Sequence, residues 1–167
     1  TIPAVPVPLT AKEDVIIFSG NFGYQPNIAA VRYFRKEVWP VLRERAPGVV
    51  WRLAGRCPEC VAQFTSGDSR IDVRGPMDNA IETLAAAKVA VAPIVSGSGT
   101  RVKIIEAWAA GVPVVSTTLG AEGLGARDGE HLLLADQATP FAEAVLSLLA
   151  GDGLRESVGA AGRRKYE

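Results

Sequence analysis

The stretch "VAVAPIVSGSGTRVKIIEAWAAGVPVVS", residues 89–116, joins two apolar runs through a turn of small residues and a helical segment. The runs 89–95 and 112–116 are almost wholly apolar, which is typical of strands covered on both faces in a parallel sheet. Segment 99–110 between them repeats apolar residues at helical spacing. A strand, a helix and a strand in this order predict a βαβ unit with a parallel sheet.

The same alternation continues through most of the chain. We expect further strands at 15–18, 49–54, 71–73 and 132–134, and helices at 26–42, 57–64, 78–87, 140–150 and 153–166. Asp78 is expected to cap the helix 78–87 at its amino end. Together these units predict an α/β fold, a Rossmann-like doubly wound and mostly parallel sheet with helices on both faces. Ligands of such folds bind at the carboxyl ends of the strands, where the strand order reverses.

Charge and composition exclude several classes of function. The 18 basic and 18 acidic side chains cancel, so the chain has no general attraction to nucleic acid or to an anionic membrane. No apolar run approaches the roughly 20 residues that span a bilayer, and none resembles a secretory signal. Two cysteines do not predict a disulfide scaffold. A cytoplasmic or membrane-peripheral compartment is therefore expected.

The two ends of the sequence suggest one domain of a longer protein. Residues 1–12 place three prolines in a short segment that is typical of an extended linker, here from a missing N-terminal domain. Residues 13–167 are expected to form one domain. Its last helical pattern is still running at "GRRKYE", which indicates a C-terminal truncation.

Three features coincide in residues 97–106. Glycines in the turn let the backbone approach a ligand closely, and the first turn of a helix offers unpaired N–H groups to an anion. Lys103 and Glu106 share one helix face, where an ammonium could bind a phosphate and a carboxylate could bind two vicinal hydroxyls. The alternative is equally open: glycine turns often only connect elements, and Lys–Glu pairs at this spacing are usually solvated.

Two common phosphate-binding motifs are absent from the sequence. No Gly–Lys–Ser/Thr follows the turn at 97–100, which excludes a P-loop. The first strand–helix turn reads "SGNFGYQP", residues 19–26, without the glycine pattern of dinucleotide-binding proteins. A nicotinamide dehydrogenase is therefore the least favoured enzyme class.

Segment "GTRVKIIEAWAAGVPVVSTTLGAEGL", residues 99–124, resembles the donor-binding signature of GT-B glycosyltransferases of the group 1, or family 4, type. Four further segments match the family in the same order along the chain, at residues 18–34, 49–58, 73–94 and 128–150. The resemblance implies two Rossmann-like domains that face each other across a cleft. This chain is similar to the C-terminal domain, which binds the nucleotide-sugar.

The resemblance also implies roles for individual residues. Glu106 matches the carboxylate that binds the ribose hydroxyls. The turn whose amides lie against the diphosphate is matched by Gly97, Ser98, Gly99 and Thr100. The segment beside the nucleobase is matched by Arg74, Gly75 and Met77, and the first glycine loop near the phosphates by Gly20 and Asn21.

Two positions depart from the family pattern. Ser98 stands where many relatives have a glutamate that contacts the donor sugar, which leaves the sugar open and permits a weakened site. The first loop also lacks the Arg and Lys that relatives often carry there. We therefore infer that Arg101 and Lys103 supply the positive charge that stabilises the departing diphosphate.

Other chemically active residue types are expected to be structural. His131 stands alone before an apolar strand and is expected in a loop. Cys57 and Cys60 form one C-x-x-C without the further ligands of a zinc site, and we expect ordinary surface cysteines rather than a redox motif. The three tryptophans are expected to pack. Without a D-x-D pair, neither a metal nor another cofactor is expected.

The sequence thus predicts the donor-binding domain of a retaining, hexosyltransferase-type glycosyltransferase that uses a UDP- or GDP-linked sugar. The acceptor would come from the missing N-terminal domain, the isolated domain would be inactive, and nucleic acid would not bind. The full-length protein would be bacterial, with a peripheral contact on the inner membrane face. A GT-B sugar-nucleotide epimerase and a non-catalytic nucleotide-sugar-binding module remain the alternatives.

Overall fold

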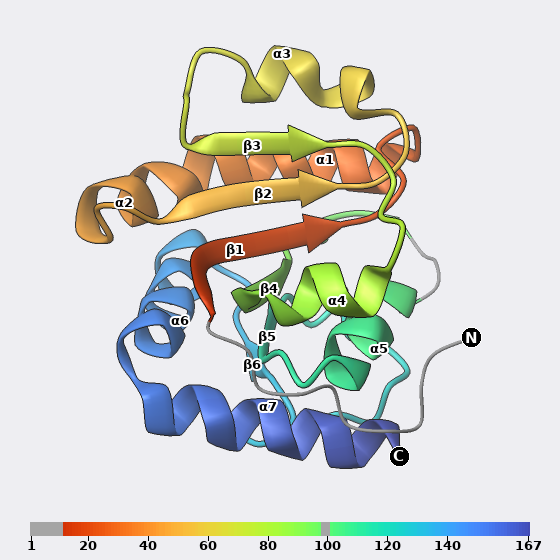
Figure 1. The fold of residues 1–167 in the computed structure, drawn as a ribbon, viewed down its shortest axis with the longest axis vertical. Helices are drawn as coiled ribbons and strands as arrows, with labels where there is room; N and C mark the ends of the chain where they lie inside the picture. Colours follow the sequence, from red (N-terminus) through yellow and green to blue (C-terminus); the bar gives the residue numbers. More distant parts are fainter. Residues whose placement is uncertain (1–11, 98–100) are drawn as a thin grey trace.

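The computed structural model describes residues 12–97 and 101–167. Six parallel strands form one sheet in the order β3-β2-β1-β4-β5-β6 (Figure 1). This is the order of a doubly wound dinucleotide-binding sheet, and the strand order reverses between β1 and β4. The predicted Rossmann-like α/β fold is therefore confirmed.

The elements lie close to their predicted places. The strands are β1 (Glu13–Ser19), β2 (Val50–Ala54), β3 (Ile71–Arg74), β4 (Ala87–Ala92), β5 (Val114–Ser116) and β6 (Leu133–Leu134). The helices are α1 (Gln25–Tyr33), η1 (Phe34–Val38), α2 (Trp39–Arg45), η2 (Pro58–Val61), α3 (Ala62–Thr65), α4 (Ala80–Ala85), α5 (Val102–Ala109), α6 (Ala138–Ala150) and α7 (Asp152–Tyr166).

The central strand β1 contributes to both faces of the sheet. Ile16 and Phe18 belong to a core that packs under α1, α2 and α6, whereas Val15 and Ile17 belong to a second core with α4 and α5. Successive side chains of a strand point to opposite faces, so an unbroken apolar run is what a strand between two helical layers requires. The tryptophans pack in these cores as predicted: Trp39, Trp51 and Trp108 are all buried.

The first crossover is not one regular helix. A π-helical segment, η1, separates α1 from α2, and Pro40 lies at the start of α2. Proline has no N–H to donate and its ring crowds the preceding turn, so a regular α-helix cannot run through this position. A local widening of the helix is one way to accommodate such a break.

Two strand boundaries near the site differ from the prediction. Strand β4 ends at Ala92 rather than at residue 95, and Pro93 follows it. Strand β5 begins at Val114, after Pro113. Proline cannot donate a ladder hydrogen bond, so these two strands end and begin beside their prolines.

The predicted cap at Asp78 is wrong. The side chain of Asn79 accepts a hydrogen bond from the Glu82 amide and caps α4. An amide side chain satisfies an unpaired N–H of the first turn as well as a carboxylate does, so sequence pattern alone does not separate two adjacent candidates.

No helix in the described part of the chain is both long enough and apolar enough to cross a bilayer.

Candidate functional site

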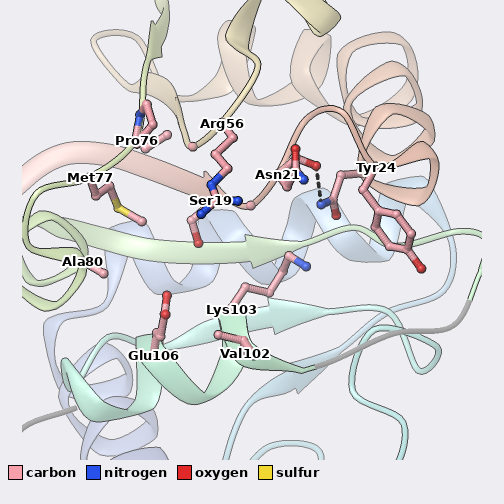
Figure 2. A pocket seen from close by; sticks show the side chains of 14 residues that line it. Ser19, Asn21, Tyr24, Arg56, Pro76, Met77, Ala80, Val102, Lys103 and Glu106 are labelled. Atoms are coloured by element: carbon pink, nitrogen blue, oxygen red, sulfur yellow. Dashed lines mark hydrogen bonds between the residues drawn. The ribbon is translucent and has the colours of Figure 1, made fainter. Parts of the chain in front are cut away.

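A cleft of about 530 Å³ lies along the carboxyl ends of β1 and β2, between them and the first turns of α5 (Figure 2). It is lined by Ser19, Gly20, Asn21, Tyr24, Asn27, Ala54, Gly55, Arg56, Pro76, Met77, Ala80, Val102, Lys103 and Glu106. The cleft opens beside the point where the strand order reverses, which is the edge where doubly wound folds bind ligands.

The loop after β1 forms one wall of this cleft. The buried side chain of Asn27 donates through Nδ2 to the Asn21 carbonyl at 2.9 Å, and Asn21 Oδ1 accepts from the Gly23 amide at 2.9 Å. A side chain at Gly20 would place its Cβ 2.9 Å from Asn27 Nδ2 and 3.6 Å from Lys103 Cε. The absence of a Cβ therefore lets the loop fold tightly around its own amides and close to α5.

Lys103 reaches from α5 across to this loop, as Figure 2 shows. Its Nζ lies 5.9 Å from the ring centre of Phe18, at the end of β1. Burial lowers the pKa of Lys103, the positive charge of Arg101 lowers it further, and Glu106 opposes both. The ammonium is thus held in a cleft that disfavours its charge, and an anionic ligand would relieve this cost.

Glu106 lies about one turn further along α5 and also faces the cleft. Burial raises the pKa of Glu106, and the nearby Lys103 acts in the opposite direction. No ion pair between Lys103 and Glu106 occurs among the described residues. The two groups therefore both line the cleft and do not bond to each other.

Arg101 lies just before α5, and its side chain is bonded to the segment after β5. Its Nε donates to the Glu122 carbonyl at 2.9 Å, and one terminal nitrogen lies 3.4 Å from a Glu122 carboxylate oxygen. Arg101 is not among the residues that line the cleft. Its predicted contact with a diphosphate stays a prediction, and only Lys103 of the two expected cations faces the space.

The glycine turn before α5 is described in part. Gly97 has a φ of 85°, and a Cβ there would lie 2.4 Å from Pro26 Cγ. Only a glycine allows this turn to pack on the start of α1. The predicted residues Ser98, Gly99 and Thr100 lie outside the described residues.

The residues predicted beside a nucleobase divide between two clefts. Met77 lines the main cleft and also a neighbouring one of about 310 Å³, which Arg74 and Gly75 line together with the start of α4. Arg74 Nε donates to Asp72 at 3.0 Å. The smaller cleft adjoins the main one through Met77 and Pro76, so the three predicted residues border one continuous region.

Sequence reasoning missed Arg56, which lines the main cleft from the loop after β2. Figure 2 shows its side chain directed into the space from the wall opposite α5. A signal was available, because Arg56 comes two residues after the predicted strand 49–54 and the carboxyl ends of parallel strands meet at one edge. No motif singles it out, however.

The expectation of ordinary surface cysteines is wrong. Cys57 and Cys60 form a disulfide with a Cα–Cα distance of 5.4 Å, and both are half-buried. With Glu59 they form the one group of potential metal ligands found among the described residues. Sulfur atoms joined to each other carry no thiolate for a metal, so this group cannot hold one in its oxidised form.

His131 lies in the loop before β6, as predicted. Its Nδ1 accepts from the Arg127 amide at 3.0 Å, and its carbonyl accepts from Trp108 Nε1 at 3.0 Å. Both bonds stabilise the loop, and His131 is not among the residues that line the main cleft.

A family model for "Glycosyl transferases group 1" matches residues 13–151. Among curated proteins, a phosphatidyl-myo-inositol mannosyltransferase of Mycobacterium leprae is 39% identical over 100 residues, which are 56% of this chain and 27% of that protein. An uncharacterized 44.6 kDa protein in the cps region of Klebsiella pneumoniae is 22% identical over 140 residues, 79% of this chain and 36% of that protein. The chain thus spans about a third of the length of these relatives.

Solved structures share the fold. A mutant of TarM from S. aureus, in complex with fondaparinux, alpha-GlcNAc-glycerol and UDP, superposes with a TM-score of 0.80 at 16% identity, over 98% of this chain and 34% of that one. Anabaena Alr3699/HepE in complex with UDP and glucose gives 0.76 at 14% identity, over 93% of this chain and 44% of that one.

Proposed function

This chain belongs to the group 1 glycosyl transferases, and we propose that it is the domain that binds the nucleotide-sugar donor of a retaining, hexosyltransferase-type enzyme with the GT-B fold. The chain covers about a third of its relatives, so the acceptor would be held by the part of the protein outside this chain. The isolated domain would bind a donor without transferring its sugar.

One observation carries the proposal: Lys103 and Glu106 project from one helix into the same cleft without pairing with each other. The ammonium suits an anionic phosphate, and the carboxylate suits two vicinal hydroxyl groups. A nucleoside diphosphate carries both groups a few ångströms apart. Met77 and Pro76 offer an apolar surface on the β3 side, where a nucleobase would lie.

The contribution to catalysis would be electrostatic. When the bond between the sugar and the diphosphate breaks, negative charge builds up on the departing phosphate oxygen. A fixed ammonium such as that of Lys103 stabilises this charge more in the transition state than in the ground state. We assign the stabilisation of the departing phosphate to positively charged groups of the chain and propose no metal ion.

Binding across a panel of nucleotide-sugars tests the proposal. Ligand-observed NMR of the 167-residue chain against UDP-, GDP- and ADP-sugars should show binding of at least one of them, and the parent nucleoside diphosphate should compete for the same site. Absence of binding to the whole panel would overturn the donor role.

Two enzyme assays separate the proposal from its alternatives. A sugar-nucleotide epimerase would convert the donor without an acceptor, whereas the proposed enzyme would need one. The non-catalytic module is favoured by one observation: the loop Gly20–Asn21 lines the cleft but carries no cation. Donor turnover by the full-length protein with an acceptor extract would exclude that module.

A further inference from the structure

We propose that Arg56 binds the diphosphate of the donor from the wall of the cleft opposite Lys103. The inference rests on the proposed function, since it assumes a nucleoside diphosphate in this cleft. Arg56 would supply the charge that the uncharged loop after β1 does not provide.

The charged residues that line the cleft are the first observation behind this proposal. Among its described lining residues, two are cationic, Arg56 and Lys103, and one is acidic, Glu106. Arg101 does not line the cleft, and its guanidinium is bonded to Glu122. A diphosphate in this cleft would therefore face two cationic side chains, one from the loop after β2 and one from α5.

The backbone holds Arg56, in the loop after β2, against the loop after β1. The preceding residue, Gly55, is buried, and a Cβ on it would lie 1.7 Å from the Gly20 carbonyl oxygen. Only a glycine allows the ends of β1 and β2 to approach this closely. The Gly20 amide donates to the Ala54 carbonyl at 3.2 Å and the Phe22 amide to the Arg56 carbonyl at 2.9 Å, so Arg56 lies against the loop after β1.

The turn after Arg56 is fixed as well. Cys57 has a φ of 56°, the one positive φ of a non-glycine residue in the described part of the chain. The disulfide from Cys57 to Cys60 closes this turn, and Cys57 Cβ lies 3.8 Å from the Cβ position of Gly23. Because the backbone on both sides is held, Arg56 presents its guanidinium from a defined place at the rim.

The donors of the Arg56 guanidinium are not used by the fold that the structure describes. Within residues 12–97 and 101–167, no hydrogen bond or ion pair engages this side chain, whereas Arg43, Arg52, Arg70 and Arg163 are all bonded to protein groups. An arginine offers five N–H donors in a planar fork that fits two phosphate oxygens. Its place in the cleft and its unused donors fit a ligand with several anionic oxygens.

Binding titrations of variants test the assignment. Arg56→Gln should weaken binding of UDP, GDP or ADP, whichever the chain binds, by about tenfold, the scale for hydrogen bonds to a charged group. Binding of the matching nucleoside should change by less than about twofold. Arg56→Lys should recover part of the loss because it keeps the charge without the fork.

Arg164→Gln is the matched control, since it removes the same charge from the exposed face of α7. It should leave both affinities unchanged. An Arg56→Gln loss no larger than that of the control, or an equal loss for nucleoside and diphosphate, would overturn the role of Arg56 while leaving the donor site in place. If the unsubstituted chain binds none of the three diphosphates, the proposed function fails, and the role of Arg56 fails with it.

Discussion

The charged side chains at the two ends of the sheet differ in whether other protein groups bond to them. At the amino end, before β3, the side chain of Asp68 is only 5% exposed and accepts hydrogen bonds from Trp39 Nε1, Arg43 Nε and the Arg70 amide, each at 2.9 Å. Burial by itself raises the pKa of Asp68, but the bonds from Trp39, the Arg70 amide and Arg43 lower it to about 2. Every oxygen of this carboxylate is used by the fold.

At the carboxyl end, Lys103 and Glu106 face the cleft without pairing, and burial disfavours the charge of each. The charges of Lys103 and Glu106 thus have no ion-pair partner in each other, whereas the carboxylate of Asp68 is fully hydrogen-bonded by neighbouring groups. Unpaired charges in a cleft cost stability and are a mark of ligand-binding sites. The comparison predicts that substitutions at the amino end change stability, and those at the carboxyl end change binding.

The largest effect is expected at the amino end. Asp68→Ala should lower the free energy of unfolding by about 3 kcal/mol, because it leaves the buried Trp39 indole N–H without an acceptor and removes the partner of Arg43. Denaturant unfolding measures the loss, with Glu44→Ala on the exposed side of α2 as the control. A loss below about 1 kcal/mol would show that the cluster is not a structural anchor.

The same carboxylate sets an acid limit to stability. Because the pKa of Asp68 is depressed to about 2 in the fold, its contribution is present above the ordinary value of 3.8 and is lost as the pH falls towards 2. The stability difference between the unsubstituted chain and Asp68→Ala should therefore shrink over that range. A constant difference down to pH 2 would contradict the assigned hydrogen bonds.

A smaller effect is expected at Lys103, and it concerns ligand binding instead of stability. Lys103→Met keeps an unbranched apolar side chain at this position but removes the charge, and it should weaken nucleoside diphosphate binding by about 2 kcal/mol. Nucleoside binding should be unchanged, and the free energy of unfolding should not fall, because an unpaired charge leaves a partly buried site. Equal losses for nucleoside and diphosphate would mean that the lysine only supports the helix.

Glu106→Gln should have the weaker effect of about 1 kcal/mol on binding, because the amide oxygen still accepts one of the two hydroxyl bonds. This loss should be the same for nucleoside and nucleoside diphosphate, since the ribose is common to both. Calorimetric titration measures it, with Glu156→Gln on α7 as the control. A loss confined to the diphosphate would place Glu106 beside the phosphates instead.

The pH dependence of binding is expected to be the smallest effect near neutral pH. Because the pKa of Lys103 is lowered, diphosphate affinity should begin to fall at a pH below the ordinary lysine value of 10.5. Because the pKa of Glu106 is raised, affinity should begin to fall on the acid side above the ordinary value of 4.5. In the Lys103→Met variant, the decrease of diphosphate affinity at alkaline pH should disappear. If the decrease persists, another group causes it.

Part of the site could be predicted because some of its residues are close together in the sequence. Lys103 and Glu106 are about one helical turn apart, so a predicted helix already places them on one face. The turn at Gly97 was identifiable for the same local reason. The side-chain direction of Arg101 could not be predicted, because its partner Glu122 belongs to the segment after β5 and meets it only in the folded chain.

Taken alone, the sequence determined the alternation of strands and helices, the parallel sheet and the edge where the ligand groups would gather. These features depend on apolar periodicity and on turn residues, which act over a few neighbouring positions. Only the tertiary structure decided which cations face the cleft and which are bonded elsewhere, and it joined Cys57 to Cys60 at the rim. The orientation of a charged side chain depends on contacts between segments far apart in the chain, and the packing of the sheet fixes those contacts.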